Sequence, residues 1–252
     1  MTALLEIEML SKHFGGVQAI NELSFAVEEG EILGLIGPNG AGKTTLFNLI
    51  SGVFPCDRGR IRFRGTDIAG ATPYRIARHG LARTHQIVQP FESMTVLENC
   101  TVGACFGREN LSRAAAGEAA REAAVFVGLE DRLETPAAQL TIAGKKRLEL
   151  ARAVAARSVL LMLDEVLAGL NPTEVEHMIG VIRGIRARGT AILMIEHLMQ
   201  AIMSLSDRIV VLNSGQKLAE GSPGDVANNA AVIEAYLGDP ELARELHGGA
   251  AI

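Results

Sequence analysis

The feature that most constrains this chain is a glycine-rich stretch of eight residues, Gly37–Thr44, with the sequence GPNGAGKT. It follows the apolar run Ile32–Ile36, which predicts a buried strand, and precedes Thr45–Ile50, which predicts the start of a helix. Glycines let successive backbone N–H groups curl around an anion, and the helix N-terminus adds unpaired N–H groups with partial positive charge. The pattern predicts a phosphate-binding loop rather than an ordinary turn.

Within this loop, Lys43 can reach the β- and γ-phosphates of a nucleotide, and the Thr44 hydroxyl can bind Mg²⁺. The expected ligands are therefore a nucleotide and Mg²⁺. The residues expected to bind the nucleotide here are Gly37, Pro38, Asn39, Gly40, Ala41, Gly42, Lys43, Thr44 and Thr45.

Two further apolar runs end in side chains that can carry chemistry. Val159–Leu163 precedes Asp164 and Glu165, which predicts a buried parallel strand that delivers two carboxylates to the sheet edge where the phosphate loop lies. Asp164 would hold Mg²⁺ through water, and Glu165 would orient or deprotonate an attacking water. The run Thr190–Ile195 leads to His197, which can bond the γ-phosphate, although a lone histidine is more often structural.

Two other candidates are ambiguous when taken alone. Phe14 precedes a Gly-Gly turn and can stack on an adenine ring, but a half-buried strand aromatic has the same pattern. Gln86 follows a short strand and can ligate Mg²⁺ or orient a water, but it also reads as a solvated loop residue.

Composition limits the setting of these motifs. The chain has 252 residues and a net charge of −5, so no overall basic field recruits nucleic acid. Three cysteines without a C-x-x-C pair indicate a reducing compartment, and Met1–Leu10 lacks the basic start of a signal peptide. The longest apolar runs are far shorter than a membrane span. We expect a cytosolic chain whose membrane role, if any, comes through a partner.

The order of predicted elements indicates a sheet protein with a helical insertion. Gly59–Phe63 is expected as an edge strand, and the alanine-rich segment Val96–Val127 as an inserted helical subdomain. The other expected elements are strands at 4–9 and 23–27, helices at 73–79, 147–156, 172–188 and 231–237, and a hairpin of strands 208–213 and 217–221.

Taken together, these motifs resemble the ATP-binding subunits of ABC transporters, over nearly the whole chain to Gly238. Within that family the chain looks most like the subunits of branched-chain amino-acid importers. The residues that carry the resemblance occur along the chain in the same order as in that family. They are Phe14, Gly37–Thr45, Gln86, Leu140–Arg147, Asp164-Glu165, Ala168–Pro172, His197 and Val232–Gly238.

The resemblance implies an α/β fold: a RecA-like phosphate-loop core with an N-terminal antiparallel β-subdomain and an inserted α-helical subdomain. The core with its β-subdomain would span residues 1–88 and 158–238. The helical subdomain with the signature region would span 89–157, and residues 239–252 would form a flexible tail.

The resemblance also implies a mechanism. Two ATP-binding subunits, identical or different, would pair head-to-tail, so that each ATP contacts the phosphate loop of one subunit and Thr141, Ala143 and Gly144 of the other. Gln86, Glu165 and His197 would act in hydrolysis, and Thr44, Gln86 and Asp164 would hold Mg²⁺. Membrane-spanning permease subunits would be the direct partners at the cytoplasmic face of the inner membrane, and a solute-binding protein an indirect one.

Several positions depart from the family pattern. Ile142 and Ala143 replace the two glycines of the signature, and Gly144 stands where glutamine is usual. The Ala143 Cβ would push the backbone off the γ-phosphate, or the loop would shift so that Gly144 serves. Val166 replaces a usual proline, and His85 a usual phenylalanine. These departures favour ATP binding over fast hydrolysis and leave open a heterodimer with one competent site.

Other functions fit parts of the pattern. An importer subunit for urea, an amide or an aromatic acid would carry the same motifs, because this subunit never touches the solute. A soluble ABC ATPase that acts on nucleic acid, ribosomes or lipid-export machinery is a second class, and its nucleic-acid and translation members usually have two cassettes or long coiled-coil insertions. A kinase or GTPase would leave the 140–152 segment and His197 unexplained. The sequence favours the importer.

Overall fold

The computed structural model describes residues 3–236, which divide into two compact units. Unit 1 comprises the residues up to Pro73 together with those from Ala191 onward, and unit 2 comprises Tyr74–Thr190. The predicted boundaries at residues 88 and 158 stay predictions, and the predicted tail lies outside the described residues. Across residues 3–236, every helix is too short or too polar to cross a membrane.

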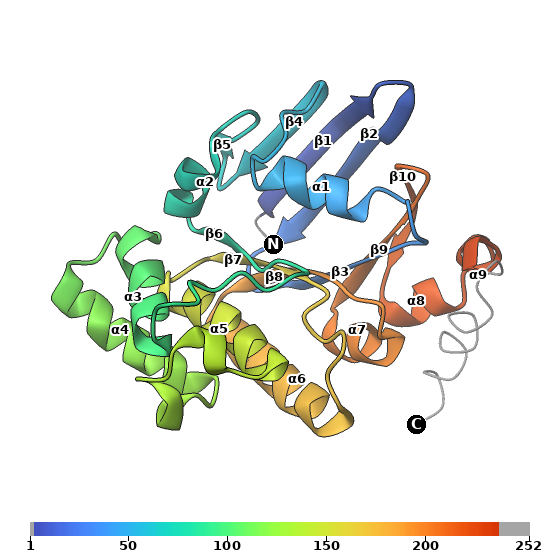
Figure 1. Cartoon of the computed structure of the whole chain (residues 1–252). Helices are drawn as coiled ribbons and strands as arrows, with labels where there is room; N and C mark the ends of the chain where they lie inside the picture. The colour runs from blue at the N-terminus through green and yellow to red at the C-terminus, as the bar shows by residue number, and fades with distance from the viewer. Residues whose placement is uncertain (1–2, 237–252) are drawn as a thin grey trace. The chain divides into compact units, whose positions relative to one another are not determined.

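Unit 1 contains two groups of strands (Figure 1). An antiparallel sheet has the order β2-β1-β4-β5, and in the second group β3 pairs in parallel with both β8 and β9, while β10 is antiparallel to β9. The elements of unit 1 are β1 (Ala3–Phe14), β2 (Val17–Glu28), β3 (Ile32–Ile36), α1 (Lys43–Ile50), β4 (Arg58–Phe63), β5 (Thr66–Asp67), β8 (Ala191–Ile195), α7 (Met199–Leu205), β9 (Arg208–Asn213), β10 (Gln216–Gly221), α8 (Pro223–Ala227) and α9 (Ala230–Tyr236).

The strand over Gly59–Phe63 forms as predicted, but it is not an edge strand. β4 pairs with β1 on one side and with β5 on the other. The reason is a tight turn after Phe63, where Arg64 has φ 52° and Gly65 has φ 72°, because two consecutive residues with positive φ reverse a chain into a hairpin. The short strand β5 therefore covers the edge of β4.

Strand β3 leads into the glycine loop and is fully buried, as its continuous apolar sequence predicts. Its parallel pairing places Leu35 opposite Ile195 of β8 and Val210 of β9. The carboxyl ends of β3 and β8 therefore lie at the same edge of this group of strands. This edge is where the loop after Ile36 and the residues after Ile195 begin.

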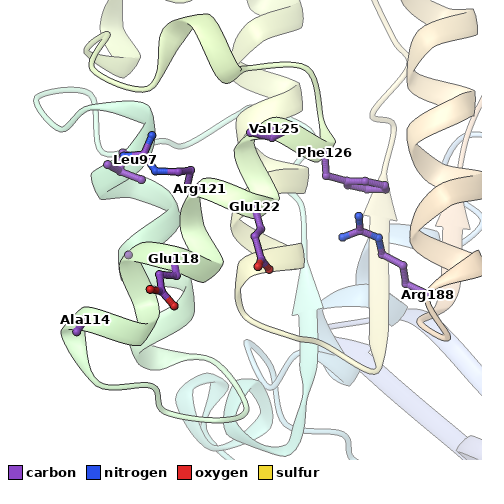
Figure 2. Close-up of a pocket in the computed structure, with 9 residues that line it drawn as sticks. Leu97, Ala114, Glu118, Arg121, Glu122, Val125, Phe126 and Arg188 are labelled. Carbon is purple, nitrogen blue, oxygen red and sulfur yellow. The ribbon is translucent and has the colours of Figure 1, made fainter.

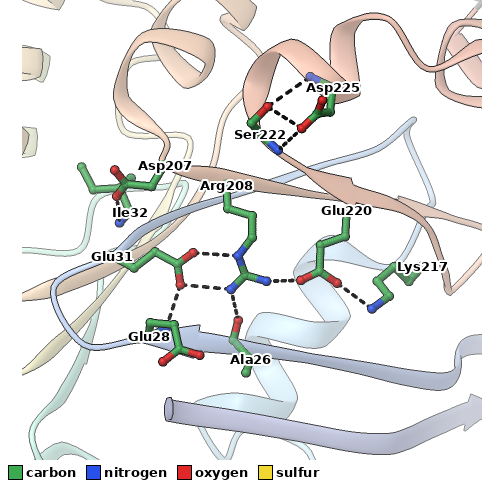
Figure 3. A network of polar contacts seen from close by, with 10 residues as sticks. All are labelled: Ala26, Glu28, Glu31, Ile32, Asp207, Arg208, Lys217, Glu220, Ser222 and Asp225. Carbon is green, nitrogen blue, oxygen red and sulfur yellow. Dashed lines mark hydrogen bonds and ion pairs between the residues drawn. The ribbon is translucent and has the colours of Figure 1, made fainter. Parts of the chain in front are cut away.

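An ion-pair network ties the strands of unit 1 together around Arg208 (Figure 3). The Arg208 guanidinium donates to both carboxylate oxygens of Glu31, at 2.9 and 3.1 Å, and to the carbonyl of Ala26 at 2.7 Å. It also pairs with Glu220, which accepts a second bond from Lys217 at 2.6 Å. Because one planar guanidinium meets β2, the start of β3 and β10, it fixes their relative register.

Unit 2 is mainly helical, with a parallel strand pair in which Leu81 lies opposite Leu160 (Figure 1). Helices α3, α4 and α5 pack on one another, and α4 turns its alanines inward, which permits close approach. The elements of unit 2 are α2 (Pro73–His79, which begins at the unit boundary), β6 (Leu81–Arg83), α3 (Val96–Phe106), α4 (Arg113–Phe126), the 3₁₀ turns η1 (Glu130–Arg132) and η2 (Ala137–Gln139), α5 (Ile142–Ala155), β7 (Leu160–Asp164) and α6 (Pro172–Ala187).

Helix α5 begins at Ile142, five residues before the predicted start. Thr141 is its N-cap, with an extended backbone and a side-chain oxygen that accepts from the Gly144 N–H at 3.1 Å. A threonine at this position satisfies one of the unpaired N–H groups of the first turn, so the helix extends back to it. The signature residues are therefore the first turn of α5 and not a loop in front of it.

Candidate functional site

The glycine loop adopts a backbone that only glycine tolerates at several points. Gly37, Gly40 and Gly42 have φ values of 156°, 80° and 103°. A Cβ on Gly37 would lie 2.2 Å from the Leu212 carbonyl oxygen, and one on Gly42 would lie 2.6 Å from that of Ala19. Gly37 and Gly42 are thus required by both the turn and the close approach of neighbouring backbone, and Gly40 by the turn alone.

Lys43 opens helix α1 and folds back over the loop. Its ammonium group donates to the carbonyls of Gly37 at 2.5 Å and Pro38 at 3.1 Å, and the residue is buried. Thr44 is exposed and Thr45 half-buried in the same turn. One positive charge and the N-terminus of α1 are therefore combined in the curve of the loop, as binding of phosphate requires.

His197 lies just beyond the end of β8 and is exposed, whereas its neighbour Glu196 is buried. Because β3 and β8 are parallel neighbours in unit 1, the fold brings His197 and the start of the phosphate loop to the same edge of the sheet. The prediction that both lie at one strand edge is consistent with this topology.

Phe14 ends β1 with 43% of its surface exposed. Its ring and that of Phe54 form a T-shaped pair with a centroid distance of 5.3 Å and an interplanar angle of 73°, and the Lys12 ammonium lies 5.4 Å from the centre of the Phe14 ring. Sequence reasoning did not single out Phe54. An exposed ring supported by a second aromatic is suited to stacking. The contact of Phe14 with adenine stays a prediction.

In unit 2, Asp164 stands at the end of β7, and two consecutive residues hold its carboxylate and its backbone N–H. Arg83 donates through Nη2 to Asp164 Oδ2 at 2.9 Å, and the Thr84 hydroxyl accepts from the Asp164 N–H at 3.1 Å. Both partners of the ion pair are nearly buried, with exposed side-chain fractions of 9% and 4%. Neither Arg83 nor Thr84 was predicted to act here.

Glu165 follows with φ 52°, a left-handed conformation that is uncommon outside glycine. Gln86 donates through Nε2 to Glu165 Oε2 at 2.7 Å, so the structure brings these two predicted residues together. The buried Lys146 of α5 donates to the carbonyls of Glu165 at 3.2 Å and Ala168 at 2.6 Å. Sequence reasoning assigned no role to Lys146, although it lies two residues after the signature, because its burial cannot be read from the sequence.

The signature residues differ in exposure. Ile142 is 64% exposed, whereas Ala143 is 6% exposed and helps to line a cavity of about 210 Å³ together with α6. The Gly144 N–H already bonds to Thr141. In this structure that N–H bonds within the chain, and the expectation that Gly144 serves in place of the missing glycines stays a prediction.

The predicted magnesium ligands fit the metal in chemical type. Thr44, Gln86 and Asp164 offer a hydroxyl, an amide oxygen and a carboxylate, and Mg²⁺ prefers such hard oxygen donors. Within residues 3–236, three or more histidine, cysteine or acidic side chains nowhere gather into a metal-binding group.

Unit 2 also has an open hollow of about 800 Å³ along α4 (Figure 2). Arg188 lies over the ring of Phe126, with its guanidinium carbon 3.8 Å from the ring centre, at one end of the hollow, and Leu97 lies near the other. None of the residues predicted for nucleotide chemistry lines it. The hollow is a surface feature of the helical region.

Comparison with known protein families gives two matches. Residues 20–168 match the family described as ABC transporter, and residues 216–241 match the family described as branched-chain amino acid ATP-binding cassette transporter. Among curated proteins, the chain is 41% identical to the high-affinity branched-chain amino acid transport ATP-binding protein LivG of Salmonella typhimurium and 39% identical to BraF of Pseudomonas aeruginosa. Each alignment covers 94% of this chain and 98% of the relative.

Solved structures agree. A structure of MJ1267, an ATP-binding cassette of an ABC transporter, matches with a TM-score of 0.84 and 29% identity, over 94% of this chain and 100% of that one. The ADP conformation of MJ1267 matches with a TM-score of 0.80 and 29% identity. The predicted α/β fold with an antiparallel β-subdomain and a helical subdomain is confirmed.

Proposed function

Because this chain belongs to the ABC transporter ATP-binding subunits, in the group of the branched-chain amino acid transport proteins, we propose that it drives import of a branched-chain or related amino acid. It would act at the cytoplasmic face of the inner membrane, bound to permease subunits and paired with a second ATP-binding subunit. The observation that carries this proposal is the bond between Gln86 and Glu165, which links the hydrolytic residue to an exposed apolar segment.

For the nucleotide, the phosphate loop and Lys43 would bind the β- and γ-phosphates. Thr44, Asp164 and Gln86 would hold Mg²⁺, which neutralises phosphate charge when bound. Glu165 would orient or deprotonate the attacking water, and His197 would hydrogen-bond the γ-phosphate. Phe14 would stack on the adenine. Thr141, Ala143 and Gly144 would face the nucleotide of the other subunit in the dimer.

For the permease, the segment that follows Gln86 offers a docking surface made of Ile87, Phe91 and Met94. Their exposed fractions are 76%, 42% and 36%, an unusual group of apolar side chains on one short loop. The direct bond from Gln86 to Glu165 would let a movement of this surface reach the catalytic carboxylate. We expect a cytoplasmic loop of a permease subunit to bind here.

This docking surface is firmly anchored to unit 2. The fully buried Asn99 donates to the carbonyls of Phe91 at 3.0 Å and Met94 at 3.2 Å, and its side-chain oxygen accepts from the Phe91 N–H. Arg152 lies 4.9 Å from the centre of the Phe91 ring and donates to the Gln89 carbonyl at 3.0 Å. A rigid surface of this kind would transmit force between permease and ATPase without first having to fold.

The experiment is a mild-detergent pull-down of the tagged chain from its native cells, in wild-type form and as Ile87→Ser. We expect the wild-type chain to recover two multi-span membrane proteins and a second ATP-binding subunit. The solute-binding protein made by the same cells would then be screened against branched-chain amino acids, urea, amides and aromatic acids.

The Ile87→Ser variant should lose most of the membrane proteins while its ATP binding stays unchanged, because Ile87 is exposed and distant in sequence from the phosphate loop. Met9→Ser, at a strand residue of unit 1 that is 53% exposed, is the matched control. Recovery of only soluble partners, ribosomes or nucleic acid by the wild-type chain would overturn the transport role. Full recovery by Ile87→Ser would overturn the docking surface alone.

A further inference from the structure

We propose that Arg83 is a positioning residue for Asp164, an internal counter-ion that holds this carboxylate ready for Mg²⁺. The inference rests on the proposed role of Asp164 in binding the metal. The observation that supports the inference is the ion pair between Arg83 Nη2 and Asp164 Oδ2, with a distance of 2.9 Å, at the end of the strand pair β6–β7.

The sequence places the arginine there by strand register. β6 and β7 run in parallel, with Arg83 opposite Met162, and the Thr84 N–H continues the ladder with a bond to the Met162 carbonyl at 2.9 Å. β6 therefore ends at Arg83, opposite a residue that lies two positions before Asp164, the last residue of β7. The next residue, Thr84, accepts the backbone N–H of Asp164, so side chain and backbone of the aspartate are fixed separately.

Because both side chains are nearly buried, removing one of them would leave the other charge without its partner, at a cost in free energy. The side chains of Arg83 and Asp164 are 9% and 4% exposed, and a buried carboxylate without a partner is strongly unfavourable. The two side chains share one charged hydrogen bond, from Nη2 to Oδ2, and such a bond is stronger and more directional than a neutral one. The ion pair engages Oδ2, so Oδ1 is not part of it.

From this we infer a defined effect on metal binding. A group that orients a metal ligand through a hydrogen bond typically contributes a factor of about 10–100 to metal affinity. If Arg83 orients Asp164, its removal should weaken the Mg²⁺-dependent part of nucleotide binding and leave the Mg²⁺-independent part unchanged. A merely structural ion pair would lower the stability of unit 2 without changing the ratio of these two parts.

The experiment measures the dissociation constant of a fluorescent ATP analogue on the full chain, once with Mg²⁺ and once with EDTA. In Arg83→Met, the ratio of the dissociation constant in EDTA to the dissociation constant in Mg²⁺ should fall by about tenfold, the low end of the typical range. Binding in EDTA should stay as in the wild type. Arg78→Met is the matched control, because Arg78 of α2 makes an exposed bond to Asn110.

Two more variants separate the possible failures. Arg83→Lys keeps the charge without the planar fork, should fold if Arg83→Met does not, and should lower the ratio less. Asp164→Asn should lower the ratio at least as much as Arg83→Met. If Asp164→Asn lowers it but neither Arg83 variant does, or if either Arg83 variant raises it, Arg83 does not position the carboxylate. If Asp164→Asn leaves the ratio unchanged, the role proposed for Asp164 is itself wrong, and the inference falls with it.

Discussion

The phosphate loop of unit 1 and the carboxylate segment of unit 2, residues 164–168, carry chemistry in opposite ways. The loop is held by its own backbone: three glycines take positive φ, and Lys43 bonds to carbonyls only five and six residues away. The carboxylate segment is held by side chains from distant parts of the chain. Arg83 and Gln86 reach it across about 80 residues, and Lys146 reaches it from helix α5.

This difference decides how each region fails. The loop is disturbed mainly by changes at its own glycines, because they take positive φ and two of them lie against the backbone of Leu212 and Ala19. A segment held by distant side chains is disturbed by changes far away that leave its own residues intact. The two regions should therefore separate in experiment: variants of the loop should affect nucleotide binding with or without Mg²⁺, and variants around the segment should affect hydrolysis or only the Mg²⁺-dependent part of binding.

The largest separation is expected from Glu165→Gln. The glutamine keeps the size of the side chain and can still accept the bond from Gln86, but it cannot take a proton from water. We expect ATP hydrolysis to fall by about 10²–10⁴-fold, the usual contribution of a general base. ATP affinity should stay unchanged, and a nucleotide-bound dimer should accumulate in size-exclusion chromatography. Glu176→Gln, at an exposed position of α6, is the control; unchanged turnover in Glu165→Gln would remove Glu165 from the mechanism.

A smaller effect on the other region is expected from Gly42→Ala. The added Cβ would lie 2.6 Å from the Ala19 carbonyl oxygen, at a residue with φ 103°. Strain of about 1–3 kcal/mol at such a position would weaken ATP binding by roughly tenfold to a hundredfold, measured by fluorescence titration.

Two other glycines sharpen this test of the loop. Gly40→Ala has the strained φ without a close contact, so it should weaken ATP binding less than Gly42→Ala. Gly117→Ala, in the open on helix α4, should leave ATP binding unchanged and can raise stability by about 0.5–1 kcal/mol, as alanine does for glycine in helices. Equal ATP affinity in Gly42→Ala and Gly117→Ala would contradict a backbone-encoded loop.

The same difference explains what sequence reasoning achieved. Strand β3, the glycine loop and the helix after it follow from adjacent residues, and they were predicted within a residue or two. Helices α7 and α8 were not predicted, because each has only five to seven residues and no long apolar period. The start of α5 was predicted late, because the Thr141 cap was treated as part of a loop.

Within the candidate site, the motifs gave the residues that carry reactive groups but not those that hold them. Gln86 and Glu165 were both predicted, and the structure brings them together. Arg83, Thr84 and Lys146 lie beside predicted residues in the sequence, yet their roles depend on strand register and burial. Single-sequence patterns do not contain that information, since an arginine or lysine in a polar stretch usually faces solvent.

The smallest effect concerns Lys146, which ties helix α5 to the carboxylate segment. Lys146→Met keeps the length of the side chain but leaves the carbonyls of Glu165 and Ala168 without this donor. A charged hydrogen bond of this kind contributes about 1.5–3 kcal/mol, so the free energy of unfolding, measured by urea titration, should fall by that amount. ATP hydrolysis should fall by less than in Glu165→Gln, with ATP affinity unchanged. Lys145→Met removes a more exposed pair with Glu92 and should cost under about 1 kcal/mol. If both lysine variants behave alike, or if Lys146→Met weakens ATP binding instead, the long-range tie does not serve the carboxylate segment.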